Sequence, residues 1–220
     1  MSHLREELLR RRDADQEARV SVPRGAPNAL ANTMRIDDEN AVWLREVVTK
    51  FGWPGRSVVG DDGAHAAWLL AQHADRDPAL QKHCLTLLEQ AVAVSEAEPR
   101  DLAFLTDRVR LASGQSQIYG TQMTPRGGRF AARRLADPET VDERRASVGL
   151  EPLNEYLNRA LELYGPPSPA RMICPNCSAE IGVWLPEPGA RTTVECASCH
   201  SIWNVRPSIP ETTMPVVTQT

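Results

Sequence analysis

Two stretches in the last quarter of the sequence, Cys174-Pro175-Asn176-Cys177 and Cys196-Ala197-Ser198-Cys199, decide how the chain is divided. Each is a CxxC pair that can form a tight knuckle, and the eighteen residues between them are enough for a β-hairpin. Four thiolates at this spacing can surround one tetrahedral Zn²⁺. The pattern therefore predicts a zinc ribbon over residues 172–207 that holds one structural zinc ion through Cys174, Cys177, Cys196 and Cys199.

Length and composition predict a second, larger folded unit before the ribbon. Of the 220 residues, 41% are hydrophobic and 25% are charged, a globular composition with room for one ordinary domain and one small module. The stretch from Gly165 to Pro169 contains three prolines and is typical of a stiff linker. We expect a helical domain over 1–165, a Pro-rich linker over 166–171, the ribbon, and a disordered tail over 208–220.

Net charge and cysteine usage indicate the environment of the protein. The formal net charge of -4 offers no general attraction to nucleic acid or to an anionic membrane. No apolar run is long enough to span a bilayer, and the first residues lack the apolar core of a signal peptide. Four of the five cysteines lie in the CxxC pairs and only Cys84 is left, so metal ligation is expected rather than disulfide bonding. These observations predict a cytoplasmic protein.

Helical periodicity dominates the larger unit, so the predicted fold class is mainly α: a helical domain of about six to seven helices plus the small β-hairpin ribbon. The clearest start signal is Asp77 as N-cap with Pro78 at the first helical position. The stretch 64–74 is apolar nearly all round and predicts a central, buried helix. The other helices are expected at 2–19, from Asp37 or Asp38 to 51, 78–95, 99–112, 138–147 and 152–164, with a loop over 20–33.

Two ionisable residues stand in apolar surroundings and are candidate catalytic residues. His73 ends the most buried helix, and Asp107 falls at helical spacing between Phe104 and Leu111. A carboxylate in an apolar stripe has to be paired, hydrogen-bonded or shifted in pKa. We expect His73 to act as acid or base with Asp107 as its orienting partner. The candidate ligand-binding residues, which would hold an anionic or amide group, are Asp75, Arg108, Gln117, Tyr119, Thr121 and Gln122.

A set of motifs over about residues 5–160 resembles the bacterial domain-of-unknown-function family 6624. The resemblance implies one domain and marks its polar residues, and the family has no assigned activity. The motifs are Asp15-Gln16 with Arg19, Gly52-Trp53-Pro54, Gln72-His73-Ala74-Asp75, Gln81, Asp107-Arg108, Gln117, Tyr119-Gly120-Thr121-Gln122, Val141-Asp142-Glu143-Arg144-Arg145 and Gly149-Leu150-Glu151-Pro152-Leu153-Asn154-Glu155-Tyr156.

The last module resembles the short CPNC-type zinc-ribbon finger, with Trp203 as the aromatic that follows the second knuckle. It departs from the common form at Ser178 and His200, where glycines are usual, so the two turns are expected to be less relaxed. Between Met172 and Pro207 there are two arginines and three glutamates, a sum of -1 before thiolates and metal are added. A structural or protein-docking role is therefore favoured over nucleic-acid binding.

Two classes of function stay open on these observations. In the first, the polar residues of the helical domain converge on a pocket and bind a small polar or anionic ligand. In the second, the protein is a non-catalytic regulatory or interaction protein: the same residues lock the fold, and the ribbon recruits a protein partner. The two differ in location, because a ligand site must reach solvent and a structural lock need not.

Overall fold

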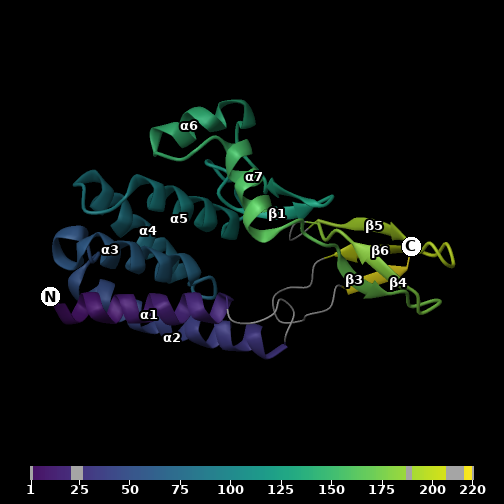
Figure 1. Ribbon diagram of the computed structural model, residues 1–220, viewed down its shortest axis with the longest axis horizontal. Helices are drawn as coiled ribbons and strands as arrows, with labels where there is room; N and C mark the ends of the chain where they lie inside the picture. Colours follow the sequence, from purple (N-terminus) through teal and green to yellow (C-terminus); the bar gives the residue numbers. More distant parts are fainter. Residues whose placement is uncertain (1, 21–26, 187–189, 207–215, 220) are drawn as a thin grey trace. The chain divides into compact units, whose positions relative to one another are not determined.

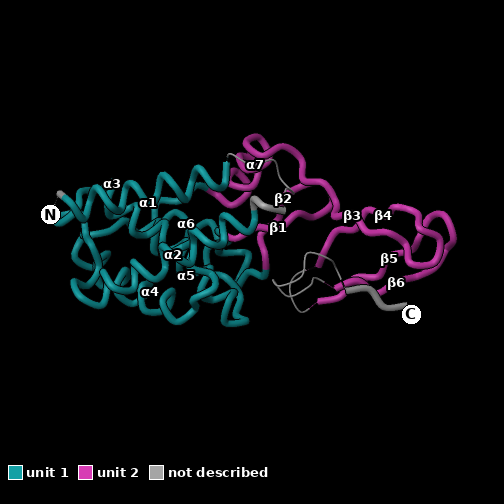
Figure 2. Tube along the Cα trace, turned by 90° about the horizontal axis from the view of Figure 1, so that it is seen from below, with its two compact units in different colours: residues 1–121, 134–151 teal, residues 122–133, 152–220 magenta. Residues whose placement is uncertain are grey.

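The computed structural model describes residues 2–20, 27–186, 190–206 and 216–219. The chain forms two compact units, which Figure 2 colours teal and magenta. Unit 1 contains residues 1–121 and 134–151, and unit 2 contains residues 122–133 and 152–220. None of the helices in these described ranges is long and apolar enough to cross a membrane.

Unit 1 is a bundle of helices, as the periodicity predicts (Figure 1). Its hydrophobic core is built around leucines that the helices turn inward, among them Leu8, Leu44, Leu70, Leu88 and Leu105. The helices are α1 (Ser2–Val20), α2 (Pro27–Phe51), α3 (Arg56–His73), α4 (Pro78–Ala93), α5 (Pro99–Ala112) and α6 (Val141–Ser147), the last preceded by a 3₁₀ turn at Pro138–Thr140.

The predicted start of α4 is confirmed, and the predicted start of α2 is not. Asp77 caps α4 by accepting a hydrogen bond from the Leu80 N–H at 3.0 Å, as expected. The prediction that α2 begins at Asp37 or Asp38 is wrong, because the helix already begins at Pro27. Proline suits the first turn of a helix, and Ala29, Leu30 and Ala31 are strong helix formers, so the segment continues as helix rather than as a loop.

Helix α3 is the central helix of the bundle, and its inward positions carry small residues. Ala66, Ala67 and Ala71 are completely buried, which allows neighbouring helices to approach it closely. The helix begins earlier than predicted, at Arg56, and is interrupted at Gly60, whose φ of 74° and ψ of 169° lie outside the helical region. Glycine tolerates this conformation because it has no Cβ. Helix α3 ends at His73.

Unit 2 contains a short hairpin that the sequence analysis did not predict. Strands β1 (Met123–Arg126) and β2 (Arg129–Ala132) pair antiparallel across Gly127 and Gly128, both with positive φ. A two-residue turn with positive φ at both positions is the type that matches the twist of a hairpin. Helix α7 (Leu153–Tyr164) packs on β2, and its Tyr164 contacts the Phe130 ring edge to face.

The ribbon of unit 2 consists of two hairpins, each containing one knuckle, rather than the single hairpin expected between the two CxxC pairs. Strand β3 (Ala170–Ile173) pairs with β4 (Glu180–Val183), and β5 (Thr192–Glu195) pairs with β6 (Ile202–Arg206). Most of the predicted tail lies outside the described residues. Its segment β7 (Val216–Gln219) pairs with β6, which differs from the expectation of a disordered tail. Val216, Val217 and Thr218 are β-branched and therefore suited to an open strand edge.

Candidate functional site

The four cysteines of the ribbon lie together, one pair from each knuckle. The Sγ atoms of Cys174 and Cys199 are 3.7 Å apart, and those of Cys177 and Cys196 are 3.6 Å apart. A tetrahedron with metal–sulfur bonds of about 2.3 Å has edges of about 3.8 Å, so the sulfur spacing fits one four-coordinate metal ion. Trp203 is buried beside Cys174 and Cys196 and covers the cluster, the role favoured for so small a core. The four cysteines can thus hold a metal ion.

The two knuckles repeat the same backbone geometry. In the first, the Ser178 N–H donates to the Cys174 carbonyl at 2.9 Å, and in the second the His200 N–H donates to the Cys196 carbonyl at 2.8 Å. Ser178 has φ of 61° and His200 has φ of 59°, in the left-handed region that glycine tolerates best. The expected strain at these two positions is therefore present in the structure.

Asp107, the predicted orienting partner of His73, has a different role. Its side chain is completely buried in unit 1. It accepts hydrogen bonds from the N–H groups of Ile118, Tyr119 and Thr121 at 2.6, 3.0 and 2.9 Å, and from the Thr121 hydroxyl at 3.0 Å. A carboxylate surrounded by donors is stabilised in its ionised form without a cation. Asp107 therefore fastens the 113–121 loop to α5.

The same loop is held from its other side by two arginines of α6. Arg144 donates to the Ile118 carbonyl at 2.9 Å, and the buried Arg145 donates to the Tyr119 carbonyl at 2.7 Å. Ile118 and Tyr119 thus each give their N–H to the Asp107 carboxylate and their carbonyl to a guanidinium. We call the set Asp107, Ile118, Tyr119, Thr121, Arg144 and Arg145 the loop lock.

The remaining candidate residues of this region are divided between the two units. The Gln117 backbone, completely buried, pairs with the chain at Arg134 and Ala136. Burial raises the pKa of the Tyr119 phenol, so that group is protonated at neutral pH. Gln122 belongs to unit 2, where its carbonyl accepts from the Arg133 N–H at 3.0 Å. The described contacts of Tyr119 and Thr121 lead to Asp107 and Arg145 rather than to His73.

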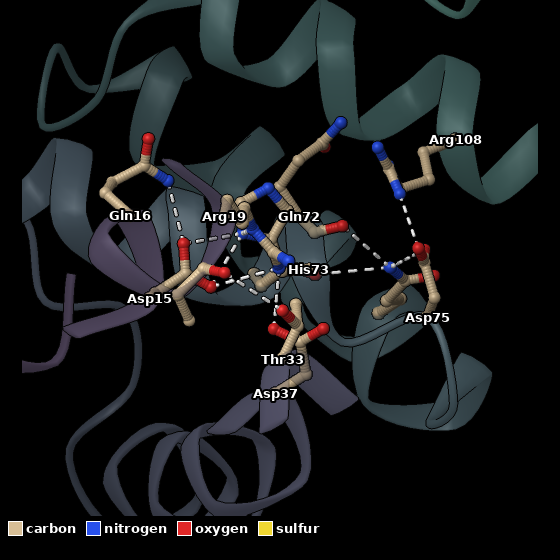
Figure 3. Close-up of polar contacts among 12 residues, drawn as sticks. Asp15, Gln16, Arg19, Thr33, Asp37, Gln72, His73, Asp75 and Arg108 are labelled. Atoms are coloured by element: carbon tan, nitrogen blue, oxygen red, sulfur yellow. Dashed lines mark hydrogen bonds and ion pairs between the residues drawn. The ribbon is translucent and has the colours of Figure 1, made fainter. Parts of the chain in front are cut away.

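His73 lies in a separate polar cluster formed by α1, α2 and α3 (Figure 3). Its Nδ1 is 2.9 and 3.0 Å from the two carboxylate oxygens of Asp15, whose side chain is completely buried. Arg19 lies beside both groups: it is 3.1 Å from Asp15 and 2.6 Å from Asp37. Asp15, rather than Asp107, therefore orients His73.

Two groups contact the same ring nitrogen of His73, Nδ1. An ionised carboxylate can only accept, so the contact with Asp15 at 2.9 Å favours a proton on Nδ1, whereas the Arg19 Nε–H points at Nδ1 from 3.2 Å and favours a bare nitrogen. The closer, completely buried Asp15 favours the Nδ1–H tautomer. None of the hydrogen bonds described for the His73 ring involves Nε2, and the side chain keeps 17% of its surface exposed.

The three acidic and basic groups of this cluster have displaced pKa values. Burial lowers the pKa of His73 more than the bond to Asp15 raises it, so the ring is neutral at pH 7. The bond to His73 and the nearby Arg19 keep the pKa of Asp15 below its ordinary value despite burial. Burial and the charge of Asp15 raise the pKa of Asp37 to about 7, because Arg19 is shared between two carboxylates. At pH 7 the cluster therefore contains a neutral base, an ionised acid and an acid that is about half protonated.

Asp15, Asp37 and His73 each bring one ligand atom within 4.8 Å of the others, a spacing that can also suit a metal ion. Arg19 contacts both carboxylates and His73, and supplies the positive charge that this set of groups requires. Hydrogen bonds and the charge of Arg19 therefore account for this cluster without a metal ion.

Next to His73, two buried polar atoms have no partner among the described residues. They are the Gln72 Oε1 and the Arg108 Nε, and the Gln72 side chain is 4% exposed. Arg108 is fixed by a 2.6 Å ion pair with Asp75, which also accepts from Gln81 at 3.2 Å. Figure 3 shows Gln72 and Arg108 on the same side of His73. We call Asp15, Arg19, Asp37, Gln72, His73, Asp75 and Arg108 the histidine cluster.

Of these seven residues, the sequence analysis named three as site candidates and three others only as parts of motifs, and it missed one. His73, Asp75 and Arg108 were candidates, whereas Asp15, Arg19 and Gln72 appeared only among the motifs of the resemblance. Nothing in the pattern singled out Asp37, which reads as a helix cap. Its role depends on α2 starting ten residues earlier, which places Asp37 within a helix beside α1.

The fold and these sites define a class of protein: a helical domain with a histidine–carboxylate pair, combined with a four-cysteine module that can hold a metal ion. The chain belongs to a family of unknown function, DUF6624, whose model matches residues 2–166. The match covers most of the chain and agrees with the resemblance seen in the motifs. No curated protein and no solved structure matches the chain.

Proposed function

We propose that the cysteine module holds one Zn²⁺ in a structural role. The sulfur spacing supports it, because both measured edges are close to those of a zinc tetrathiolate. Four protein ligands fill the coordination sphere of a tetrahedral zinc ion and leave no position for water or substrate. The ion therefore stabilises the two hairpins instead of taking part in a reaction. Elemental analysis of protein purified without chelator should give one zinc per chain. Zinc retained in full by a Cys196→Ser/Cys199→Ser variant would contradict the assignment.

We also propose that the helical unit binds a small polar ligand at the histidine cluster. The observation that carries this proposal is the pair of unpartnered buried atoms, the Gln72 acceptor and the Arg108 donor, in the same cluster as His73. Leaving a buried polar atom unbonded costs about 1–3 kcal/mol, and a ligand with one donor and one acceptor removes both costs. The buried Asp107 carboxylate already accepts from four donors of the 113–121 loop, so the loop lock supports a structural role for Asp107.

Three probes of similar size test whether the cluster binds anything: acetamide, acetate and methylammonium. Each is titrated into the full chain while NMR follows the side chains of His73 and Arg108. Binding predicts saturable shifts with at least one probe, and their loss in Arg108→Gln. Arg100→Gln is the matched control, because Arg100 is an exposed arginine on the same helix. The proposal fails if the three probes leave His73 and Arg108 unchanged.

A further inference from the structure

Two arginines lie opposite each other at one end of the second hairpin of the ribbon. Strands β5 and β6 pair Thr192 with Val205, so the next position of the same register places Arg191 opposite Arg206. Both arginines are exposed, and neither forms an ion pair within the described part of the chain. Like charges directly opposite each other on paired strands are destabilising. The two guanidinium groups therefore repel each other, and no acidic group offsets their charge.

The same two arginines line a cavity of about 160 Å³, together with Asn204 and Val205. Asn204 and Arg206 belong to the outer face of β6, because side chains alternate along a strand and Val205 is on the buried face. The Thr193 hydroxyl donates to the Asn204 Oδ1 at 3.4 Å, which leaves the NH₂ group of Asn204 open. The described side chains of this cavity thus offer three groups of donors, two guanidiniums and one amide, and include no carboxylate.

The glutamates of the ribbon that the structure describes are engaged elsewhere. Glu195 is the last residue of β5, next to the second knuckle, and its carboxylate lies 2.8 Å from the His200 Nδ1. At about 3.3 Å per residue, the four positions between Arg191 and Glu195 span about 13 Å. Glu180, on β4, forms an ion pair with Arg171 at 3.0 Å. The net charge of the ribbon sequence therefore hides a positively charged end of the second hairpin.

Size and charge together indicate which anion suits this cavity. One water molecule takes up about 30 Å³ in the liquid, so the cavity has room for a group of a few heavy atoms. A phosphate monoester carries close to two negative charges at pH 7 and has three acceptor oxygens, which matches two guanidiniums and one amide. A carboxylate or a phosphodiester carries a single negative charge and leaves one guanidinium without a counter-charge.

We propose that the cavity formed by Arg191, Asn204 and Arg206 binds a phosphate group with two negative charges, either as the free ion or as a phosphate monoester. The two arginines balance the charge, and the Asn204 amide donates to a remaining oxygen. The cavity includes neither a residue of the histidine cluster nor one of the four cysteines. This binding site is therefore separate from both proposed functions and gives the ribbon a role in addition to holding a metal ion.

Four probes test the class of anion: inorganic phosphate, O-phosphoserine, acetate and an oligothymidylate without terminal phosphate. Each is titrated at pH 7 and constant ionic strength into the full chain purified without chelator, while NMR follows the side-chain N–H groups of Arg191, Asn204 and Arg206. Phosphoserine should saturate these shifts at a several-fold lower concentration than acetate. Equal binding of inorganic phosphate identifies the free ion as a sufficient ligand, and weaker binding identifies the ester. Acetate or oligothymidylate that binds as tightly as phosphoserine overturns the proposed class, and absence of saturable shifts with both phosphates overturns the site.

Variants of exposed arginines test which groups bind the probe. Arg206→Gln should weaken phosphoserine binding about tenfold and leave the zinc content unchanged, because the charge-assisted hydrogen bonds are lost while the core is untouched. Arg171→Gln is the matched control, an exposed arginine of the first hairpin that pairs with Glu180, and should bind like wild type. Without phosphate, Arg206→Gln should also raise the chelator concentration needed to remove zinc, since the repulsion is relieved. Equal affinity of the two variants for phosphoserine would overturn the assignment of Arg206.

Discussion

The carboxylate of Asp107 accepts two hydrogen bonds from one residue, Thr121: the backbone N–H donates at 2.9 Å and the side-chain hydroxyl at 3.0 Å. Among the described contacts of Asp107, all donors are uncharged groups of the 113–121 loop. This buried anion therefore depends on peptide dipoles, and its removal affects the backbone of the loop directly.

Asp107→Asn should destabilise the protein by about 3 kcal/mol. The amide has nearly the same shape, but it keeps one acceptor oxygen and directs an NH₂ group at backbone N–H donors. Chemical denaturation monitored by circular dichroism measures the loss. Asp101→Asn, a change at a buried carboxylate on the same helix that contacts His65, is the comparison variant. A decrease of less than about 1 kcal/mol in the free energy of unfolding would show that the lock is not required for folding. Asp107 would then again be a candidate ligand-binding or catalytic residue.

Ser178→Gly and His200→Gly should each stabilise the ribbon by about 1 kcal/mol. Both residues have positive φ, a conformation that costs an L-residue with a side chain roughly 1 kcal/mol relative to glycine. The measurement is the midpoint of zinc loss under a competing chelator, which should move to higher chelator concentration. Ser198 lies in the same knuckle as His200 but has no positive φ, so Ser198→Gly should not raise the chelator concentration needed to remove zinc.

The pKa of Asp37 predicts an unusual dependence of stability on pH. Its folded-state pKa of about 7 lies above its ordinary value of 3.8, so the folded state binds the proton more tightly than the unfolded state. The contribution of Asp37 to stability is complete below pH 3.8 and is lost as pH rises toward 7 and above. Asp37→Asn should therefore gain stability over wild type as pH increases from 5 to 8. A constant difference over that range would contradict the assignment, and Asp38→Asn serves as control.

Zinc removal should unfold the ribbon while the helical unit stays folded. The described core of the ribbon consists of seven buried residues and includes two of the metal ligands, so it cannot persist without the ion. The core of unit 1 involves none of these residues. A chelator should abolish the Trp203 fluorescence signal of the folded ribbon and leave most helical circular dichroism intact. A single cooperative loss of both signals would show that the two units fold together.

The sequence predicted most helices correctly because their apolar periodicity and caps are local signals. The limits of α4 and α5 follow from Pro78 and Pro99, which mark helix starts regardless of tertiary structure. The cysteine cluster was also predictable from the sequence, since the spacing of the four cysteines in the chain determines their spacing in the fold. The β1–β2 hairpin was missed although Gly127-Gly128 is a hairpin signal, because Pro125 argues against a strand.

The composition of the candidate site was less predictable, because it depends on contacts between distant segments. The sequence correctly required a partner for Asp107 and for His73, since both stand in apolar surroundings. It paired them with each other because they were the two visible candidates. In the structure, Asp107 uses backbone donors, which periodicity cannot reveal, and His73 uses Asp15, which lies 58 residues earlier on another helix.

The loop lock also has a consequence for the speed of unfolding. Its bonds join Ile118 and Tyr119 to arginines 26 residues further along the chain, so they close only after α5 and α6 have both formed. Contacts between separated elements are costly in loop-closure entropy, so we expect these to form after the folding transition state. Loss of such contacts accelerates unfolding more than it slows folding. We therefore expect the lock to slow unfolding and to prolong the lifetime of the folded helical unit.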